Sequence, residues 1–167
     1  GCTPLPLATM VPAMPDESTW VVLTGRPAVG LLDVRSVVAL GRQPWTGHFG
    51  RLAAIDLEKV DAAMDAADVS ALAARVLQDL SDGEAQRVMI ARALAQDTPL
   101  ILLDEPMAFL DLVHRIRLLR LLKEQVRSAS KGVLLSTHDL HLALDHCDRV
   151  LLIHGKALWS GSPLEAR

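Results

Sequence analysis

Two carboxylates stand side by side after a short apolar run, in the segment LILLDEP that spans residues 100–106. The carboxyl end of a buried strand is where α/β sheets place ligand chemistry. An aspartate there can hold Mg²⁺ through water, and an adjacent glutamate can act as general base toward an attacking water. We therefore expect Asp104 to be the metal carboxylate and Glu105 the general base of a phosphoryl-transfer site. The alternative is an ordinary buried strand that ends in a polar turn.

A second candidate segment, Ser81-Asp82-Gly83-Glu84, precedes an apolar helical pattern. A serine followed three residues later by glutamate is typical of a capping box, in which each side chain bonds the other residue's backbone N–H. A capped helix start with a glycine also leaves backbone donors pointing outward, where a phosphate can bind. The two interpretations are compatible. For phosphate to bind, the carboxylates of Asp82 and Glu84 must face away or be offset by a cation.

The rest of the chain predicts alternating strands and helices. We expect strands at 19–24, 100–103, 132–136 and 149–153, an edge strand at 156–159, and helices at 33–40, 84–96 and between the later strands. Another helix follows Asp56 as its N-cap, with an apolar face of Leu57, Val60, Met64 and Ala67. The helix after 111 has the stripe Leu112, Ile116, Leu119, Leu122 and Val126. This alternation favours a parallel, covered sheet.

Composition limits the function classes. The chain has 167 residues, of which 50% are apolar, so one compact domain with a core is expected. A net charge of -3 with interspersed signs argues against a nucleic-acid binder. Cys2 and Cys147 lie far apart and suggest a reduced compartment without a metal site. No apolar run is long enough to span a membrane, so membrane association would require a partner.

Taken in order, these segments resemble the ATP-binding subunit of an ABC transporter. Ser81 to Glu84 correspond to its signature loop, Leu100 to Asp104 to the Walker B strand and Asp111 to the D-loop. His138, which follows an apolar run, corresponds to the switch histidine that contacts the γ-phosphate. Without the resemblance, a lone histidine there would be read as an ordinary loop residue. The family implies ATP and Mg²⁺ as cofactors and an α/β fold, a partial P-loop NTPase (RecA-like) parallel sheet with an α-helical signature subdomain.

The resemblance narrows to the iron-chelate import ATPases, for siderophore, haem or cobalamin, over roughly residues 19–165. The segments that carry it are 22–24, 37–47 and the signature helix. Thr24 stands where most ABC proteins have the Q-loop glutamine, which removes an amide able to reach Mg²⁺ or water. The loop 41–50 is read as a solvent-facing turn, and its residues Trp45 and Phe49 make a partner surface more plausible. In the family, this region receives the permease.

The glycine-rich motif G-x-x-x-x-G-K-[ST], which wraps the β- and γ-phosphates, does not occur in the sequence. We therefore expect a flexible or truncated lead-in at 1–18 and a partial ATPase domain at 19–167. Within that domain, 31–80 is expected to be a helical subdomain, and 81–167 to hold the signature, Walker B and switch-histidine parts of the core. Alone, this chain is expected to bind ATP weakly or not at all and to be inactive.

Two functions follow from the resemblance. The first is an ATP-hydrolysing subunit of an iron-chelate importer that pairs with a second ATPase subunit. Permease subunits would hold it on the cytoplasmic, inner face of the cell membrane. The alternative is a non-hydrolytic interaction module or degenerate remnant that lends its signature loop in trans to an intact ATPase. A chromosome-maintenance ATPase is disfavoured, because it would need coiled-coil heptads and basic residues that are not seen.

Overall fold

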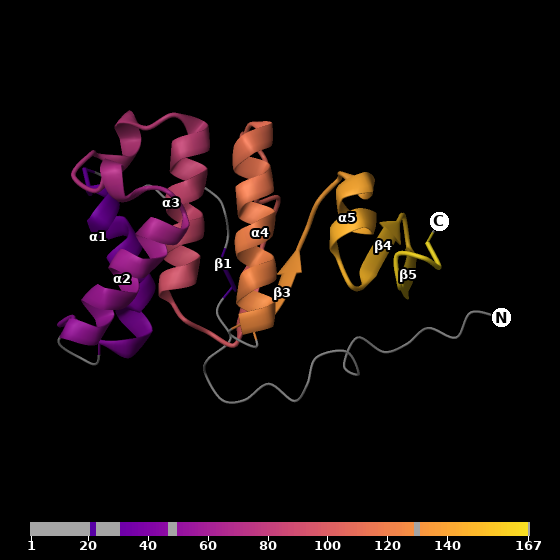
Figure 1. The fold of residues 1–167 in the computed structure, drawn as a ribbon, viewed down its shortest axis with the longest axis horizontal. Helices are drawn as coiled ribbons and strands as arrows, with labels where there is room; N and C mark the ends of the chain where they lie inside the picture. Colours follow the sequence, from indigo (N-terminus) through magenta and orange to yellow (C-terminus); the bar gives the residue numbers. More distant parts are fainter. Residues whose placement is uncertain (1–20, 23–30, 47–49, 129–130, 167) are drawn as a thin grey trace. The chain divides into compact units, whose positions relative to one another are not determined.

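The computed structural model describes residues 21–22, 31–46, 50–128 and 131–166. These residues fall into two compact units, coloured along the chain in Figure 1. One unit lies within residues 18–136 and contains the sheet, the helical part and most of the candidate site; the other contains residues 137–166. Each is described here by itself. The predicted lead-in at 1–18 lies outside the described residues.

The first unit is built on a three-stranded parallel sheet in the order β1-β2-β3. The strands are β1 (Val21–Val22), β2 (Leu100–Leu103) and β3 (Gly132–Leu135), with Leu103 paired to Leu135 at the carboxyl end. Ile101 and Leu103 are almost fully buried. The predicted parallel pairing is therefore confirmed for these three strands. The sheet is less covered than expected, because Leu134 on β3 is 58% exposed.

Three helices pack side by side next to this sheet, α1 (Val34–Ala39), α2 (Ala54–Ala66) and α3 (Asp82–Ala95). Short 3-10 turns connect them at η2 (Leu40–Trp45), η3 (Ser70–Leu72) and η4 (Leu77–Asp79). Their shared core is made of branched and small residues that recur at helical spacing. It includes Val34, Val37, Val38, Val60, Met64, Val88, Met89 and Ala91.

Three predictions about the segment before and within α2 are wrong. The helix is capped by Ala53, not by Asp56. Asp56 is instead the third residue of the helix, and its carboxylate accepts a 2.9 Å hydrogen bond from the Ala53 N–H. Leu57, assigned to the apolar face, is 41% exposed. The expected solvent-facing turn after residue 40 is largely a 3-10 helix, because Arg42 turns inward to bond the buried Asp56.

The helix α4 (Leu112–Ser128) packs against β3. Its buried positions are Leu118 and Leu122. The predicted stripe is therefore wrong at Leu112, Ile116 and Val126, which are all exposed. Periodicity alone did not identify the buried face of the helix, on which Leu118 and Leu122 lie four residues apart.

The second unit contains α5 (Leu140–His146), β4 (Val150–His154) and β5 (Ala157–Gly161). The two strands form an antiparallel hairpin with a left-handed Gly155 at the turn, φ 59°. The predicted edge strand thus pairs within a two-stranded sheet of its own, because so short a connection permits only antiparallel pairing.

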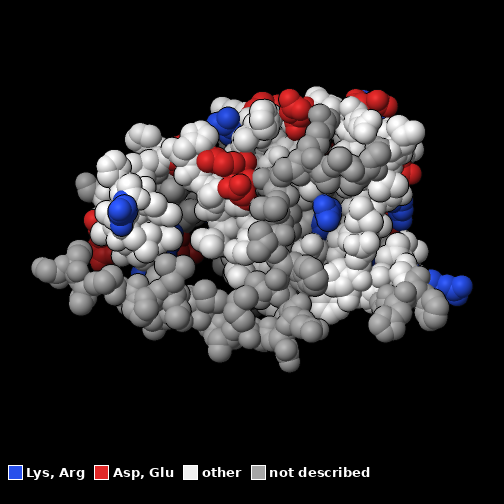
Figure 2. Space-filling view, turned by 180° about the vertical axis from the view of Figure 1, so that it is seen from behind, with Lys and Arg blue, Asp and Glu red and all other residues white. Residues whose placement is uncertain are grey.

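Across the described part of the chain, no helix is both long and apolar enough to cross a membrane. On the face drawn in Figure 2, Lys and Arg side chains lie apart from one another and form no continuous band.

Candidate functional site

The two adjacent carboxylates lie directly after β2, at the carboxyl end of the parallel sheet. Ser136, which follows the neighbouring strand β3, joins them through its hydroxyl. Its Oγ accepts from the Glu105 N–H at 2.9 Å and donates to Asp104 Oδ1 at 2.5 Å. The pairing of β2 with β3 sets this geometry, since the Ser136 N–H also bonds the Leu103 carbonyl at 2.9 Å.

Glu105 adopts a left-handed backbone conformation, with φ 44°. This conformation is uncommon for a residue with a Cβ and persists only where the surroundings impose it. Here the Glu105 N–H is held by Ser136, and its carbonyl accepts from the Ala108 N–H at 3.0 Å. The next residue, Pro106, is buried and its carbonyl accepts from Gln86 Nε2 at 3.1 Å. The turn is therefore anchored to both β3 and α3.

The donor set at this turn suits a small, hard cation. Carboxylate and hydroxyl oxygens are the ligands Mg²⁺ prefers, and it commonly takes only one or two carboxylates, with water and phosphate oxygens completing its shell. Asp104 and Ser136 supply such oxygens side by side. Among the described residues, no cluster of three or more His, Cys, Asp or Glu side chains could form an all-protein metal cage. The arrangement fits a cation that arrives with a phosphate.

The predicted capping box is confirmed at the start of α3. The Ser81 Oγ accepts from the Glu84 N–H at 3.3 Å, while the Glu84 carboxylate accepts from the Ser81 N–H at 2.9 Å. This carboxylate is also offset by a cation, because Arg75 Nη1 lies 3.3 Å from Glu84 Oε1. Hydrogen bonds from the Ser81 backbone and side chain, aided by Arg75 and Arg87, lower the pKa of Glu84. Asp82 begins the helix itself.

Gly83 is required by the close approach of another segment. A Cβ built on Gly83 would meet the Phe109 carbonyl oxygen at 3.0 Å. A residue with a side chain could fit only if the backbone after the Walker B position moved. The candidate signature loop and the turn after the paired carboxylates are thus packed against each other within one unit.

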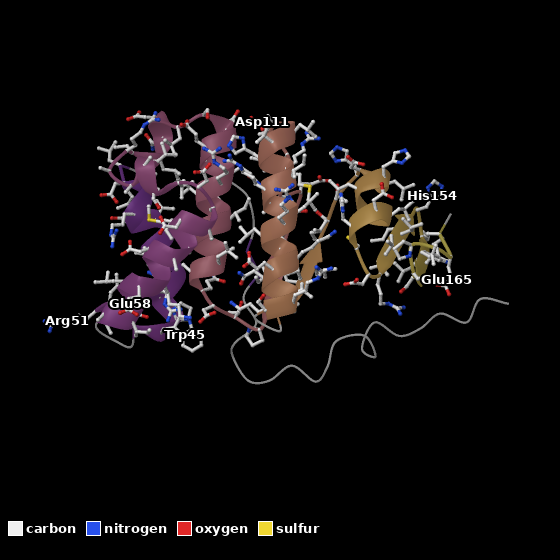
Figure 3. The ribbon with its side chains drawn as sticks, in the orientation of Figure 1. Trp45, Arg51, Glu58, Asp111, His154 and Glu165 are labelled. Atoms are coloured by element: carbon white, nitrogen blue, oxygen red, sulfur yellow. The ribbon has the colours of Figure 1, made fainter. Side chains whose placement is uncertain are left out.

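Asp111 caps α4. Its Oδ1 accepts from the His114 N–H at 2.9 Å and contacts His114 Nδ1 at 2.8 Å. These hydrogen bonds, the backbone one first, lower the pKa of Asp111. Figure 3 labels Asp111 at the end of α3 opposite to Trp45.

Trp45 marks the other end of α3. Its Nε1 donates to the Gln96 carbonyl at 2.7 Å while half of the residue stays exposed. The guanidinium of Arg42 lies 5.3 Å from the Trp45 ring centroid and forms a buried ion pair with Asp56 at 2.9 Å. Arg42 and Trp45, in the described part of the loop predicted to carry a partner surface, are therefore held by α2 and the end of α3, and Trp45 stays half exposed. Phe49 lies outside the described residues.

His138 belongs to the second unit, where the following Asp139 caps α5 by accepting from the Leu142 N–H at 3.1 Å. Thr24 lies outside the described residues. The structure brings together Ser81 to Glu84, Asp104, Glu105 and Asp111 in one unit.

Sequence reasoning did not assign roles to three residues that hold these parts in place. Ser136, Arg75 and His114 were not singled out. For Ser136, its place after an apolar strand parallel to β2 could have indicated proximity to Asp104. No sequence signal marks Arg75, because its contact with Glu84 depends on the geometry of the turn η4, which lies between the two residues.

A family model described as "ABC transporter" matches residues 20–108. The cobalamin import ATP-binding protein BtuD of Halobacterium salinarum is 44% identical over 131 residues, covering 78% of this chain and 32% of that protein. The hemin import ATP-binding protein HmuV of Nocardia farcinica is 45% identical over 130 residues, covering 77% of this chain and 44% of that protein.

Among solved structures, one transporter described as metal-chelate type, in an inward-facing conformation, superposes with a TM-score of 0.78 at 28% identity. The match covers 86% of this chain and 58% of that one. The chain spans about a third to a half of the length of the curated relatives named above.

Proposed function

We propose that this chain, which belongs to the ABC transporter family, is the signature and Walker B part of an ATP-hydrolysing importer subunit. The fold is that of an ABC ATPase cassette, with a P-loop NTPase sheet as expected. One observation carries the proposal most directly. Ser136 holds the Asp104 carboxylate and the Glu105 backbone N–H at the carboxyl end of β2, where the chemistry of parallel sheets is found.

Each residue then has a stated task. Bound Mg-ATP supplies the phosphoryl group and the charge that the site must stabilise. Asp104 holds the cation through its carboxylate or through water, and Glu105 accepts a proton from the attacking water. Gly83 places its backbone N–H at a helix N-terminus, which suits a phosphate, and the Ser81 N–H and hydroxyl hold the Glu84 carboxylate at 2.9 and 2.8 Å. Asp111 caps α4 and so positions the turn that follows the paired carboxylates. His138 stabilises charge on the γ-phosphate.

The transported substrate we propose is an iron chelate or related macrocycle such as a siderophore, haem or cobalamin. This proposal is supported by relatives whose names specify cobalamin, hemin and petrobactin import. Partners would be a second ATPase subunit and permease subunits that hold the protein at the inner face of the membrane. The fixed, half-exposed Trp45 beside Arg42 is the surface we assign to the permease, because rigid aromatic side chains are favoured at interfaces.

A second candidate function is an interaction module that offers its Ser81 loop in trans to an intact ATPase. The capping box that holds the start of α3 in place supports it.

Two preparations separate these functions. In the first, the chain is joined to the Walker A half of a hemin-import relative, and ATP hydrolysis is measured with permease in lipid vesicles. In the second, the unjoined chain is mixed with an intact ATPase whose own signature serine has been replaced. Turnover only in the joined protein supports the hydrolytic subunit, and rescue of the mixture supports the module. No turnover in either preparation would contradict both.

A further inference from the structure

His114 lies between two functional segments that are far apart in the sequence. From α4 it contacts Asp111 with its Nδ1 at 2.8 Å, and its Nε2 contacts Arg87 Nη1 on the signature helix α3. Only about a quarter of its side chain is exposed. The imidazole thus bridges the helix that begins at the signature loop and the aspartate that begins α4.

The chemistry of the two neighbours decides which ring nitrogen carries the proton. An arginine guanidinium only donates hydrogen bonds, so Nε2 must accept from Arg87. An ionised carboxylate only accepts, so Nδ1 must donate to Asp111. Both contacts are satisfied only by the neutral ring with its proton on Nδ1.

The charged groups around the ring favour the same state. Arg87 faces it from α3, and Arg117 lies one turn further along α4, where its Nη1 is paired with Asp68 at 2.6 Å. A second proton on Nε2 would place a cation directly against Arg87. Asp111 is the anion that contacts the ring, and it already holds the Nδ1 proton.

Arg87 extends the connection to the signature loop. Together with Arg75 it contributes to lowering the pKa of Glu84, which closes the capping box on Ser81. Among the described residues the buried Nε of Arg87 has no hydrogen-bond partner, and its Nη1 contacts His114 Nε2. Removing the ring would leave a part-buried guanidinium with one partner fewer, which is costly.

We propose that His114, as the neutral tautomer protonated on Nδ1, is a positioning residue that locks the signature helix to the D-loop aspartate through Arg87 and Asp111. The two loops then move as one body. The tautomer and the coupling concern the chain itself; the consequence for ATP turnover rests on the proposed function.

The tautomer is measured by nitrogen NMR of the chain with ¹⁵N-labelled histidine, in which the six histidines are assigned by single replacement. At neutral pH, His114 should show a protonated Nδ1 and an unprotonated Nε2, the reverse of the tautomer favoured by free imidazole side chains. Arg87→Met should shift it toward the common tautomer, whereas Arg117→Gln, on the same helix, should not. A His114 protonated on Nε2 in the parent chain would overturn the proposal, and the Arg87→Met and Arg117→Gln variants are not needed for that result.

The coupling is measured by a cycle of Arg87→Met and Asp111→Asn, with His114 present and in a His114→Ala background. With His114 present, the effects on the unfolding equilibrium constant should differ from additivity by roughly two- to tenfold, as for residues in one network. In the His114→Ala background the effects should add. Equal non-additivity in both backgrounds would contradict coupling through His114.

Turnover is read separately in the joined ATPase. His114→Asn retains a donor near the Nδ1 position, and His114→Gln an acceptor near the Nε2 position. If His114 must hold both segments, each variant lowers kcat with little change in KM for ATP. Unchanged kcat with the predicted tautomer would overturn the positioning role alone, while an inactive parent would count against the proposed function.

Discussion

Ser136 and Glu105 are joined by a 2.9 Å hydrogen bond in which the backbone N–H of Glu105 donates to the serine Oγ. The same oxygen donates to Asp104, so one hydroxyl fixes both carboxylate residues. It also helps to hold Glu105 in a left-handed conformation that the residue would otherwise avoid. The short polar side chain that follows β3 therefore sets the geometry of the turn after β2.

Ser136→Ala removes this hydroxyl and should lower the free energy of unfolding by about 0.5–1.5 kcal/mol, because the Glu105 N–H and Asp104 each lose a hydrogen bond at a solvent-exposed site. Urea unfolding measures the change. Ser128→Ala, at an exposed position near the end of α4, is the matched control and should leave stability nearly unchanged. Equal stability of the two variants would show that Ser136 does not anchor the turn.

The two ion pairs of α2 should differ sharply in energy. The side chains of Asp56 and Arg42 are only 6% and 8% exposed, respectively. The side chains of Arg35 and Asp61 are about half exposed. Asp56→Ala should destabilise the chain by about 3–5 kcal/mol, since it leaves a buried guanidinium without its anion. Asp61→Ala should cost at most about 1 kcal/mol. Similar thermal shifts for both variants would contradict this account of the Arg42 corner.

Gly83→Ala should destabilise the chain by about 1–3 kcal/mol, because the new Cβ meets the Phe109 backbone carbonyl, which cannot move alone. Gly132→Ala is a useful comparison, since its Cβ would meet the flexible end of the Leu100 side chain at the same 3.0 Å. Gly83→Ala should be the more damaging of the two in thermal unfolding. The opposite order would mean that the signature loop and the turn are not closely packed.

Glu84 should make stability depend on acid pH. Its pKa is lower in the folded chain than its ordinary value of 4.5, chiefly through the Ser81 N–H. The stabilisation is therefore complete above about pH 4.5 and is lost as the pH falls through the lowered pKa. Glu84→Gln should show a smaller loss of stability on acidification than the parent. Glu58→Gln, at an exposed position of α2 labelled in Figure 3, serves as control and should keep the parental slope.

The strand bounds at Leu100–Leu103 and the capping box at Ser81 and Glu84 could be predicted because each depends on a local pattern, an apolar run or a fixed spacing of three. The inward turn of Arg42 could not. It depends on Asp56 and on the Ala95 carbonyl, far along the chain, and no periodicity encodes that meeting. The stripe of α4 was misplaced for the same reason, since which face is buried depends on the neighbours and not on the helix.

The central claim is that Glu105 is the general base of an ATPase whose cation is held by Asp104. With this chain joined to a Walker A half, Glu105→Gln should retain ATP binding and lose turnover by roughly 10²–10⁴-fold. Asp104→Asn should in addition weaken the dependence on Mg²⁺, because it removes a charge from the metal site. The most direct measurement is the single-turnover rate of ATP hydrolysis by Glu105→Gln at saturating Mg-ATP. We expect this rate to fall by that factor while ATP binding stays intact. Hydrolysis at the parental rate would show that Glu105 is not the general base.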